Sequence, residues 1–164
     1  MPNLLAADGL ASPEMISRIL GVSTVLLAIG GIAYGTIRAK LGVYWTFAFA
    51  LALQGIGVLA LSVGRGVIGI GLGAALLNLG GGIQTPNLSH WVLDRAPLAI
   101  RGRAMGLLFS AQFLGPFLNS ALVAPAIADF GLRNILAIIA SLIGVGVVPT
   151  ILRARSAPLV PESH

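Results

Sequence analysis

The fold of this chain is decided by residues 66–93, a run of 28 residues that contains no Asp, Glu, Lys or Arg: GVIGIGLGAALLNLGGGIQTPNLSHWVL. Each residue of an α-helix rises about 1.5 Å, so roughly 20 residues cross a hydrocarbon layer about 30 Å thick. Four other charge-free runs are of similar length, and they occupy residues 19–37, 41–64, 104–128 and 134–152. None of the runs alternates apolar and polar residues as the strands of a membrane barrel do. The sequence therefore predicts an all-α, polytopic membrane helix bundle with five transmembrane helices.

The composition of the whole chain supports a membrane protein. Of its 164 residues, 57% are apolar and only 9% are charged, and the mean hydropathy is +0.97. A soluble domain carries roughly 25% charged residues, so this chain could not cover a water-exposed surface. The absence of cysteine excludes disulfides, zinc fingers and thiol catalysis. The ten basic residues are spread singly along the chain, which argues against nucleic acid as a partner.

We expect short loops between the five helices and treat the chain as one transmembrane region. The expected helices cover about residues 14–37, 43–63, 67–93, 103–128 and 133–152. Residues 153–164 contain two prolines and are expected to form a disordered tail.

The positions of the lysines and arginines predict the orientation, because cytoplasmic loops carry the excess. One side of the predicted bundle holds seven basic residues, Arg38, Lys40, Arg95, Arg101, Arg103, Arg153 and Arg155. The other side holds Arg18, Arg65 and Arg133. This asymmetry predicts a multi-pass protein of the plasma or inner membrane, with its N-terminus outside and its C-terminus in the cytoplasm. Because residues 1–17 resemble no signal peptide, we expect the chain to be a fragment of a longer protein.

The third predicted helix is unusually rich in glycine and amides. Pro86 and the glycines at 80–82 predict a bend or break around residues 80–87, on a helix that faces a hydrated cavity. Glycines one turn apart predict grooves where helices approach closely. These pairs are Gly31 and Gly35, Gly69 and Gly73, and Gly102 and Gly106.

The loops and helices resemble the C-terminal half of a major facilitator superfamily transporter. Residues 34–42, YGTIRAKLG, are similar to that family's cytoplasmic loop signature: Gly35, Ile37, Lys40 and Gly42 match, and Ala39 occupies the acidic position. Residues 101–106, RGRAMG, are similar to a second loop that ends in R-G-x-A-x-G. The motif residues there are Arg101, Gly102, Arg103 and Gly106. The resemblance implies a partial major-facilitator fold in which the five helices correspond to the family's helices eight to twelve.

Five amides are the main uncharged polar groups expected at membrane depth: Asn78, Gln84, Asn87, Gln112 and Asn119. Because the family's helix ten faces the cavity, we interpret them as candidates for lining a substrate cavity. Bonding between neighbouring helices is the alternative. Tyr34, Tyr44 and Trp45 are interpreted as anchors at the membrane interface.

We expect no enzyme activity, no metal site and no cofactor. Ser89 is adjacent to His90 and points elsewhere on the helix, so the two do not form a nucleophile–base pair with Asp94. No Asp or Glu lies inside the predicted spans, although ion-coupled carriers need an ionisable group there. Three possibilities follow for the coupling of transport to an ion: the ionisable group lies in N-terminal helices that this chain lacks, His90 contributes it, or transport is uncoupled.

The resemblance implies secondary transport of a small molecule by alternating access. The sequence of the fourth predicted helix is more similar to that of drug-efflux carriers than to that of sugar importers. The expected partners are a small-molecule substrate, the lipid bilayer and a missing N-terminal transporter half. The alternatives are a non-transporting membrane subunit and a small self-assembling exporter.

Overall fold

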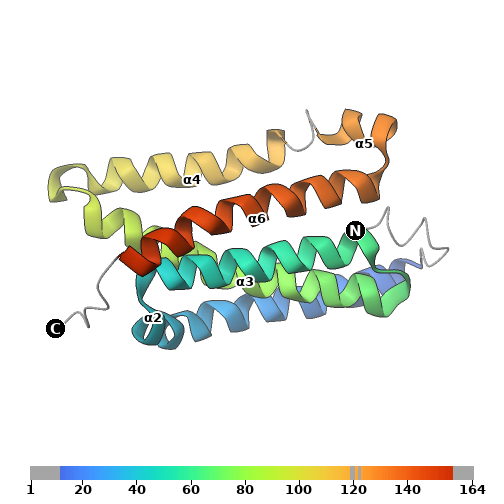
Figure 1. Ribbon diagram of the computed structural model, residues 1–164, viewed down its shortest axis with the longest axis horizontal. Helices are drawn as coiled ribbons and strands as arrows, with labels where there is room; N and C mark the ends of the chain where they lie inside the picture. Colours follow the sequence, from blue (N-terminus) through green and yellow to red (C-terminus); the bar gives the residue numbers. More distant parts are fainter. Residues whose placement is uncertain (1–11, 119–120, 122, 157–164) are drawn as a thin grey trace.

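The computed structural model describes residues 12–118, 121 and 123–156, and within these ranges the chain is helical with no strand. The elements are α2 (Pro13–Val63), α3 (Gly66–Arg95), a 3₁₀ turn η1 (Leu98–Ile100), α4 (Arg101–Leu118), α5 (Ala124–Phe130) and α6 (Leu132–Ser156). Helices α3 and α6 each lie alongside α2, and all three run along the long axis of the molecule (Figure 1). An all-helical fold is thus confirmed.

Helix α2 consists of two antiparallel arms, residues 13–41 and 43–63, which meet at Gly42 (Figure 1). Gly42 has φ 73° and ψ 174°, a backbone conformation that glycine adopts without the steric cost a Cβ would bring. The sequence predicted a loop from Arg38 to Gly42, with helices over 14–37 and 43–63. Instead, residues 38–41 stay helical and a single glycine reverses the chain. We call the two segments the first and second arms of α2.

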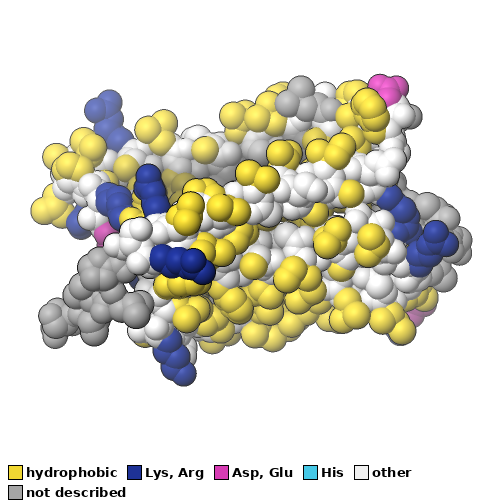
Figure 2. Space-filling view, viewed as in Figure 1, with side chains coloured by type: hydrophobic (Ala, Val, Ile, Leu, Met, Phe, Trp, Pro, Cys, Tyr) yellow, Lys and Arg dark blue, Asp and Glu magenta, His cyan; other side chains and the backbone are white. Residues whose placement is uncertain are grey.

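Three helices of the described chain are long and apolar enough to cross a membrane, namely Ser17–Val63, Gly66–Arg95 and Leu132–Ser156. The first has 47 residues, about twice the length one crossing needs, and it reverses at Gly42. Apolar side chains cover much of the flank in Figure 2, and the basic side chains gather toward the ends. Side chains such as Ile32, Ile68 and Leu142 are largely exposed, as expected for a surface that faces lipid.

The fourth predicted helix, residues 103–128, corresponds to α4 and α5. Helix α4 is described from Arg101 to Leu118 and α5 from Ala124 to Phe130. Between them the structure describes residues 121 and 123, both in a π-helical conformation. Prolines lie on both sides of this stretch, at Pro116 inside α4 and within the first turn of α5. Helix α4 is not among the three membrane-crossing candidates of the described chain.

Helix α6 also differs at its end, because it continues to Ser156. Residues 153–156 are therefore helical rather than part of a disordered tail, and residues 157–164 lie outside the described part of the chain. Helix α3 runs without interruption from Gly66 to Arg95 with Pro86 inside it. The break expected around residues 80–87 does not occur, since the neighbouring helices hold this segment on both sides.

Glycines let α3 pack tightly between the two arms of α2. A Cβ added at Gly82 would collide with the carbonyl oxygen of Leu27 in the first arm. A Cβ at Gly73 would lie 2.9 Å from the carbonyl oxygen of Gly57 in the second arm. Close backbone approach through small residues is how helices associate in lipid. The two arms and α3 therefore form one tightly packed unit.

The glycine pairs predicted from the sequence are only partly correct. Gly73 lies at a close contact, and Gly69 approaches Gly64. A Cβ at Gly35, Gly102 or Gly106 would meet nothing within 4 Å. A glycine makes a close contact only where the backbone of another helix faces it. The spacing of glycines within one helix does not show where that occurs.

Helix α6 packs on the second arm and is fastened there by Arg133. Its Nη1 donates hydrogen bonds to the carbonyl oxygens of Ser62 (3.0 Å) and Gly64 (2.6 Å). These carbonyls lie at the end of α2, where a helix leaves acceptors unpaired and carries partial negative charge. An apolar cluster of Ile19, Leu61, Ile70 and Ala74, with Leu132 and Leu136 against it, lies near this end.

Candidate functional site: the two faces of α3

Three polar side chains lie along one face of α3. Asn78, Thr85 and Ser89 are spaced seven and four residues apart, which places them on the same side of a helix. Each donates to a carbonyl four residues earlier in α3: Asn78 Nδ2 to Ala74 (2.9 Å), Thr85 Oγ1 to Gly81 (3.1 Å) and Ser89 Oγ to Thr85 (3.1 Å). Thr85 is exposed and the other two are half-buried. We call these three residues the open polar face.

Asn87 lies on a different face. Its side chain is fully buried, and Nδ2 donates to the carbonyl oxygen of Val43 in the second arm (3.3 Å). Its Oδ1 atom is buried without a hydrogen-bond partner. Asn87 therefore bonds two helices, which is the alternative that the sequence left open for the amides.

The remaining cavity candidates are scattered. Gln84 is half-buried and its Oε1 atom has no hydrogen-bond partner. Gln112 is half-buried on α4, and Asn119 lies outside the described residues. The structure thus separates Asn78 from Asn87 and adds Thr85 and Ser89 to the polar groups of α3. The spacing of 78, 85 and 89 is a signal that could have found this face from the sequence.

A hydrogen-bonded network joins the first arm to the last turns of α3. Arg38 Nη1 donates to Tyr34 Oη (2.7 Å), and Arg38 Nη2 donates to Asp94 Oδ2 (2.8 Å). Tyr34 Oη lies 3.0 Å from His90 Nδ1. Because this hydroxyl accepts from Arg38, its own proton is free to be donated to His90. Tyr34 is buried, so it acts as an interhelical contact, a role that its interpretation as an interfacial anchor missed.

The signal for this network was present in the sequence. Tyr34 and Arg38 are four residues apart, and so are His90 and Asp94, so each pair shares one helix face. Only the packing of the first arm against α3 shows that the two pairs meet. The hydroxyl of Ser89 bonds Thr85 and not His90, so these groups are not arranged as a nucleophile and its base.

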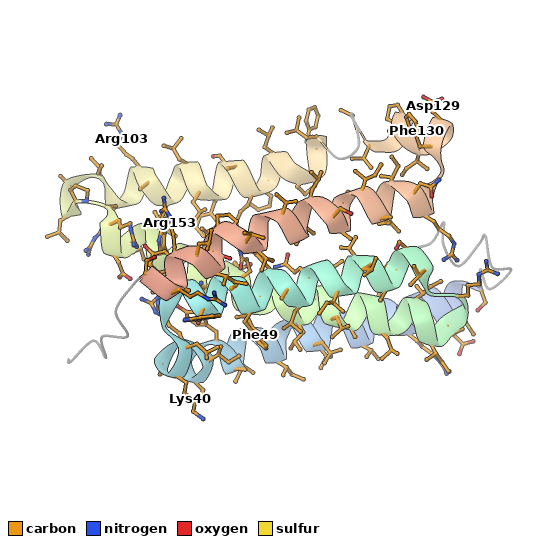
Figure 3. All side chains as sticks on the ribbon, in the orientation of Figure 1. Lys40, Phe49, Arg103, Asp129, Phe130 and Arg153 are labelled. Atoms are coloured by element: carbon orange, nitrogen blue, oxygen red, sulfur yellow. The ribbon has the colours of Figure 1, made fainter. Side chains whose placement is uncertain are left out.

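The basic residues of the loop motifs gather at one end of the bundle. Figure 3 shows Lys40, Arg103 and Arg153 at this end and Asp129 at the other. We call it the basic end, and its cations are Arg38, Lys40, Arg95, Arg101, Arg103, Arg153 and Arg155. Arg101 Nε donates to the carbonyl oxygen of Ala96 (3.2 Å), which fastens the turn before α4. In the part of the chain that the structure describes, no group of three acidic, histidine or cysteine side chains could hold a metal ion.

Comparison with models of known protein families finds no match, and comparisons with curated proteins and with solved structures find none either.

Proposed function

We propose that this chain forms part of a secondary transporter of the major facilitator type, and that it moves a small molecule out of the cell by alternating access. The two arms of α2 would correspond to the family's helices eight and nine, and α3 to helix ten. Helices α4 and α5 together would correspond to helix eleven, and α6 to helix twelve. The basic end would face the cytoplasm, because cations accumulate on that side of a membrane.

The observation that carries this proposal is the open polar face. A polar group in hydrocarbon costs several kcal/mol unless it is hydrogen-bonded. Asn78, Thr85 and Ser89 meet part of this requirement through carbonyls of their own helix. Their remaining donors and acceptors need water or further protein, and a solute path supplies water. A helix facing only lipid has no use for three such groups in one line.

The packing of α3 suits the rocking of one half of a carrier against another. Close glycine contacts on both sides tie α3 to the two arms of α2, and Arg38 ties the basic ends of the same helices together. The open polar face would therefore move with a rigid unit. The N-terminal half of the carrier is the partner that would complete the cavity.

The two alternatives make different demands on the structure. A small self-assembling exporter relies on a carboxylate within the membrane. Among the described residues, Glu14 lies in the first turn of α2 and is paired with Arg18, Asp94 lies in the last turns of α3, and Asp129 is exposed near the end of α5. A non-transporting subunit would not need the open polar face.

The test is the accumulation of a panel of fluorescent, membrane-permeant dyes by cells whose gene is intact, deleted or altered. Deletion should raise the accumulation of at least one dye. Asn78→Ala should raise the half-maximal dye concentration for efflux by roughly 5- to 150-fold, which corresponds to about 1–3 kcal/mol for a lost hydrogen bond. Ser141→Ala is the matched control, since Ser141 on α6 also bonds a carbonyl four residues earlier and is exposed.

Three outcomes would contradict the proposal. Unchanged accumulation of every dye after deletion would favour a non-transporting subunit. Robust flux in liposomes that contain only the purified 164-residue chain would favour a self-assembling exporter. Equal effects of Asn78→Ala and Ser141→Ala would remove the solute path from α3.

A further inference from the structure

A hollow of about 320 Å³ lies at the basic end, between the second arm, α3 and α6. Tyr44 and Phe47 contribute to it from the second arm, Leu88 and Trp91 from α3, and Pro149 and Arg153 from α6. The volume is at the lower end of the range for small-molecule sites. Three aromatic rings and a single cation therefore surround a space that could take part of an amphipathic molecule.

The aromatic wall is held in place by neighbouring groups. Phe47 and Trp91 pack edge to face, with ring centroids 6.3 Å apart. The guanidinium carbon of Arg95 lies 4.6 Å from the Trp91 ring centroid, and Arg95 Nη2 donates to Tyr44 Oη (2.8 Å). The cation–π contact with Arg95 holds the Trp91 ring, and the hydrogen bond from Arg95 holds the Tyr44 ring. Both rings are therefore in position before a ligand binds.

One charged side chain at the hollow lacks a partner in the described part of the chain. Arg153 is exposed and has no ion-pair or hydrogen-bond partner among the described residues. Asp94, in the last turns of α3, is bonded to Arg38. The hollow thus presents one positive charge beside an apolar wall.

We propose that this hollow binds an anionic phospholipid from the membrane leaflet at the basic end. The phosphate pairs with Arg153, and part of one acyl chain lies against Phe47 and Leu88. The charge complementarity and the location at the end of membrane-crossing helices favour a lipid as occupant. Each basic residue near the membrane surface attracts an anionic headgroup.

The experiment uses the full 164-residue chain with Trp45→Phe, which leaves Trp91 as its sole tryptophan. The chain is reconstituted into phosphatidylcholine vesicles that contain brominated phosphatidylglycerol or, in parallel, brominated phosphatidylcholine. Bromine quenches tryptophan fluorescence on contact. We expect quenching of Trp91 to saturate at a lower mole fraction of the anionic lipid, by about fivefold or more.

Three variants and one competitor decide the outcome. Arg153→Gln should remove the preference for phosphatidylglycerol, whereas Arg155→Gln, an exposed cation two residues further along, should keep it. Leu88→Phe fills the hollow and should weaken quenching by both lipids, with helicity checked by circular dichroism. Equal quenching by the two lipids, or unchanged quenching in Leu88→Phe, would overturn the proposal. Loss of the preference on adding inorganic phosphate would also overturn it, because the site would then bind free anions.

Discussion

Helices α3 and α4 are alike in sequence and opposite in packing. Both contain glycines, one internal proline and an uncharged amide. Helix α3 has seven buried residues, three of which are glycines in its packed faces, while no described residue of α4 is buried. A glycine-rich membrane helix therefore packs tightly only where its partner is present. In the proposed carrier, the bare surface of α4 would be covered by helices of the other half.

The largest effect should come from Gly82. Gly82→Ala would place a Cβ against the carbonyl oxygen of Leu27, and overpacking of this kind costs typically 1–3 kcal/mol. We expect the free energy of unfolding to fall by about 3 kcal/mol, measured by denaturant titration in detergent. Gly81→Ala is the matched control, because a Cβ there meets nothing within 4 Å. Equal losses at the two positions would show that α3 is not held as described.

The second-largest loss of stability is expected at the start of α6. Arg133→Gln removes the charge-assisted hydrogen bonds to the carbonyl oxygens of Ser62 and Gly64. A hydrogen bond that involves a charged group contributes about 1.5–3 kcal/mol. We expect a loss of about 2 kcal/mol in the same titration. Arg65→Gln, at the same end and exposed, should change the unfolding free energy little. If both variants unfold like the parent chain, Arg133 does not fasten α6 to α2.

A smaller difference in stability is expected between substitutions on the two faces of α3. Asn87→Ala removes a buried hydrogen bond to Val43 and should lower the unfolding free energy by about 1 kcal/mol. Asn78→Ala, on the open polar face, should leave it nearly unchanged. Thermal melts of the two variants check this. A lower melting temperature for Asn78→Ala than for Asn87→Ala would reverse the assignment of the faces.

The smallest effect is expected on α4. Gly106→Ala adds a Cβ where nothing lies within 4 Å, and alanine favours a helix over glycine by up to about 1 kcal/mol. The isolated chain should therefore keep or slightly raise its melting temperature. A clear loss of stability would mean that α4 packs within this chain after all.

The sequence was sufficient to predict the helical class, the grouping of the basic residues at one end and the approximate extent of α3. These depend on composition and local pattern. The network of Tyr34 and His90 and the glycine contacts of Gly82 depend on which helices meet, and one sequence does not contain that information. The turn at Gly42 lies inside the predicted loop, but the helical conformation of residues 38–41 was not predicted. Of the bend or break expected near Pro86, the break does not occur, because packing on both sides keeps α3 helical through this residue.

The most direct test of the account is the water accessibility of single cysteines on α3, in a chain that has no native cysteine. Cysteines at Asn78 and Ser89 would probe the open polar face, and a cysteine at Ile32, which is 83% exposed, would probe a surface facing lipid. The protein is labelled in the membranes of its own cells with a membrane-impermeant thiol reagent. If a solute path runs along α3, Asn78→Cys and Ser89→Cys should react several times faster than Ile32→Cys. Equal, slow labelling at all three positions would show that α3 meets lipid, and would contradict a solute path along it.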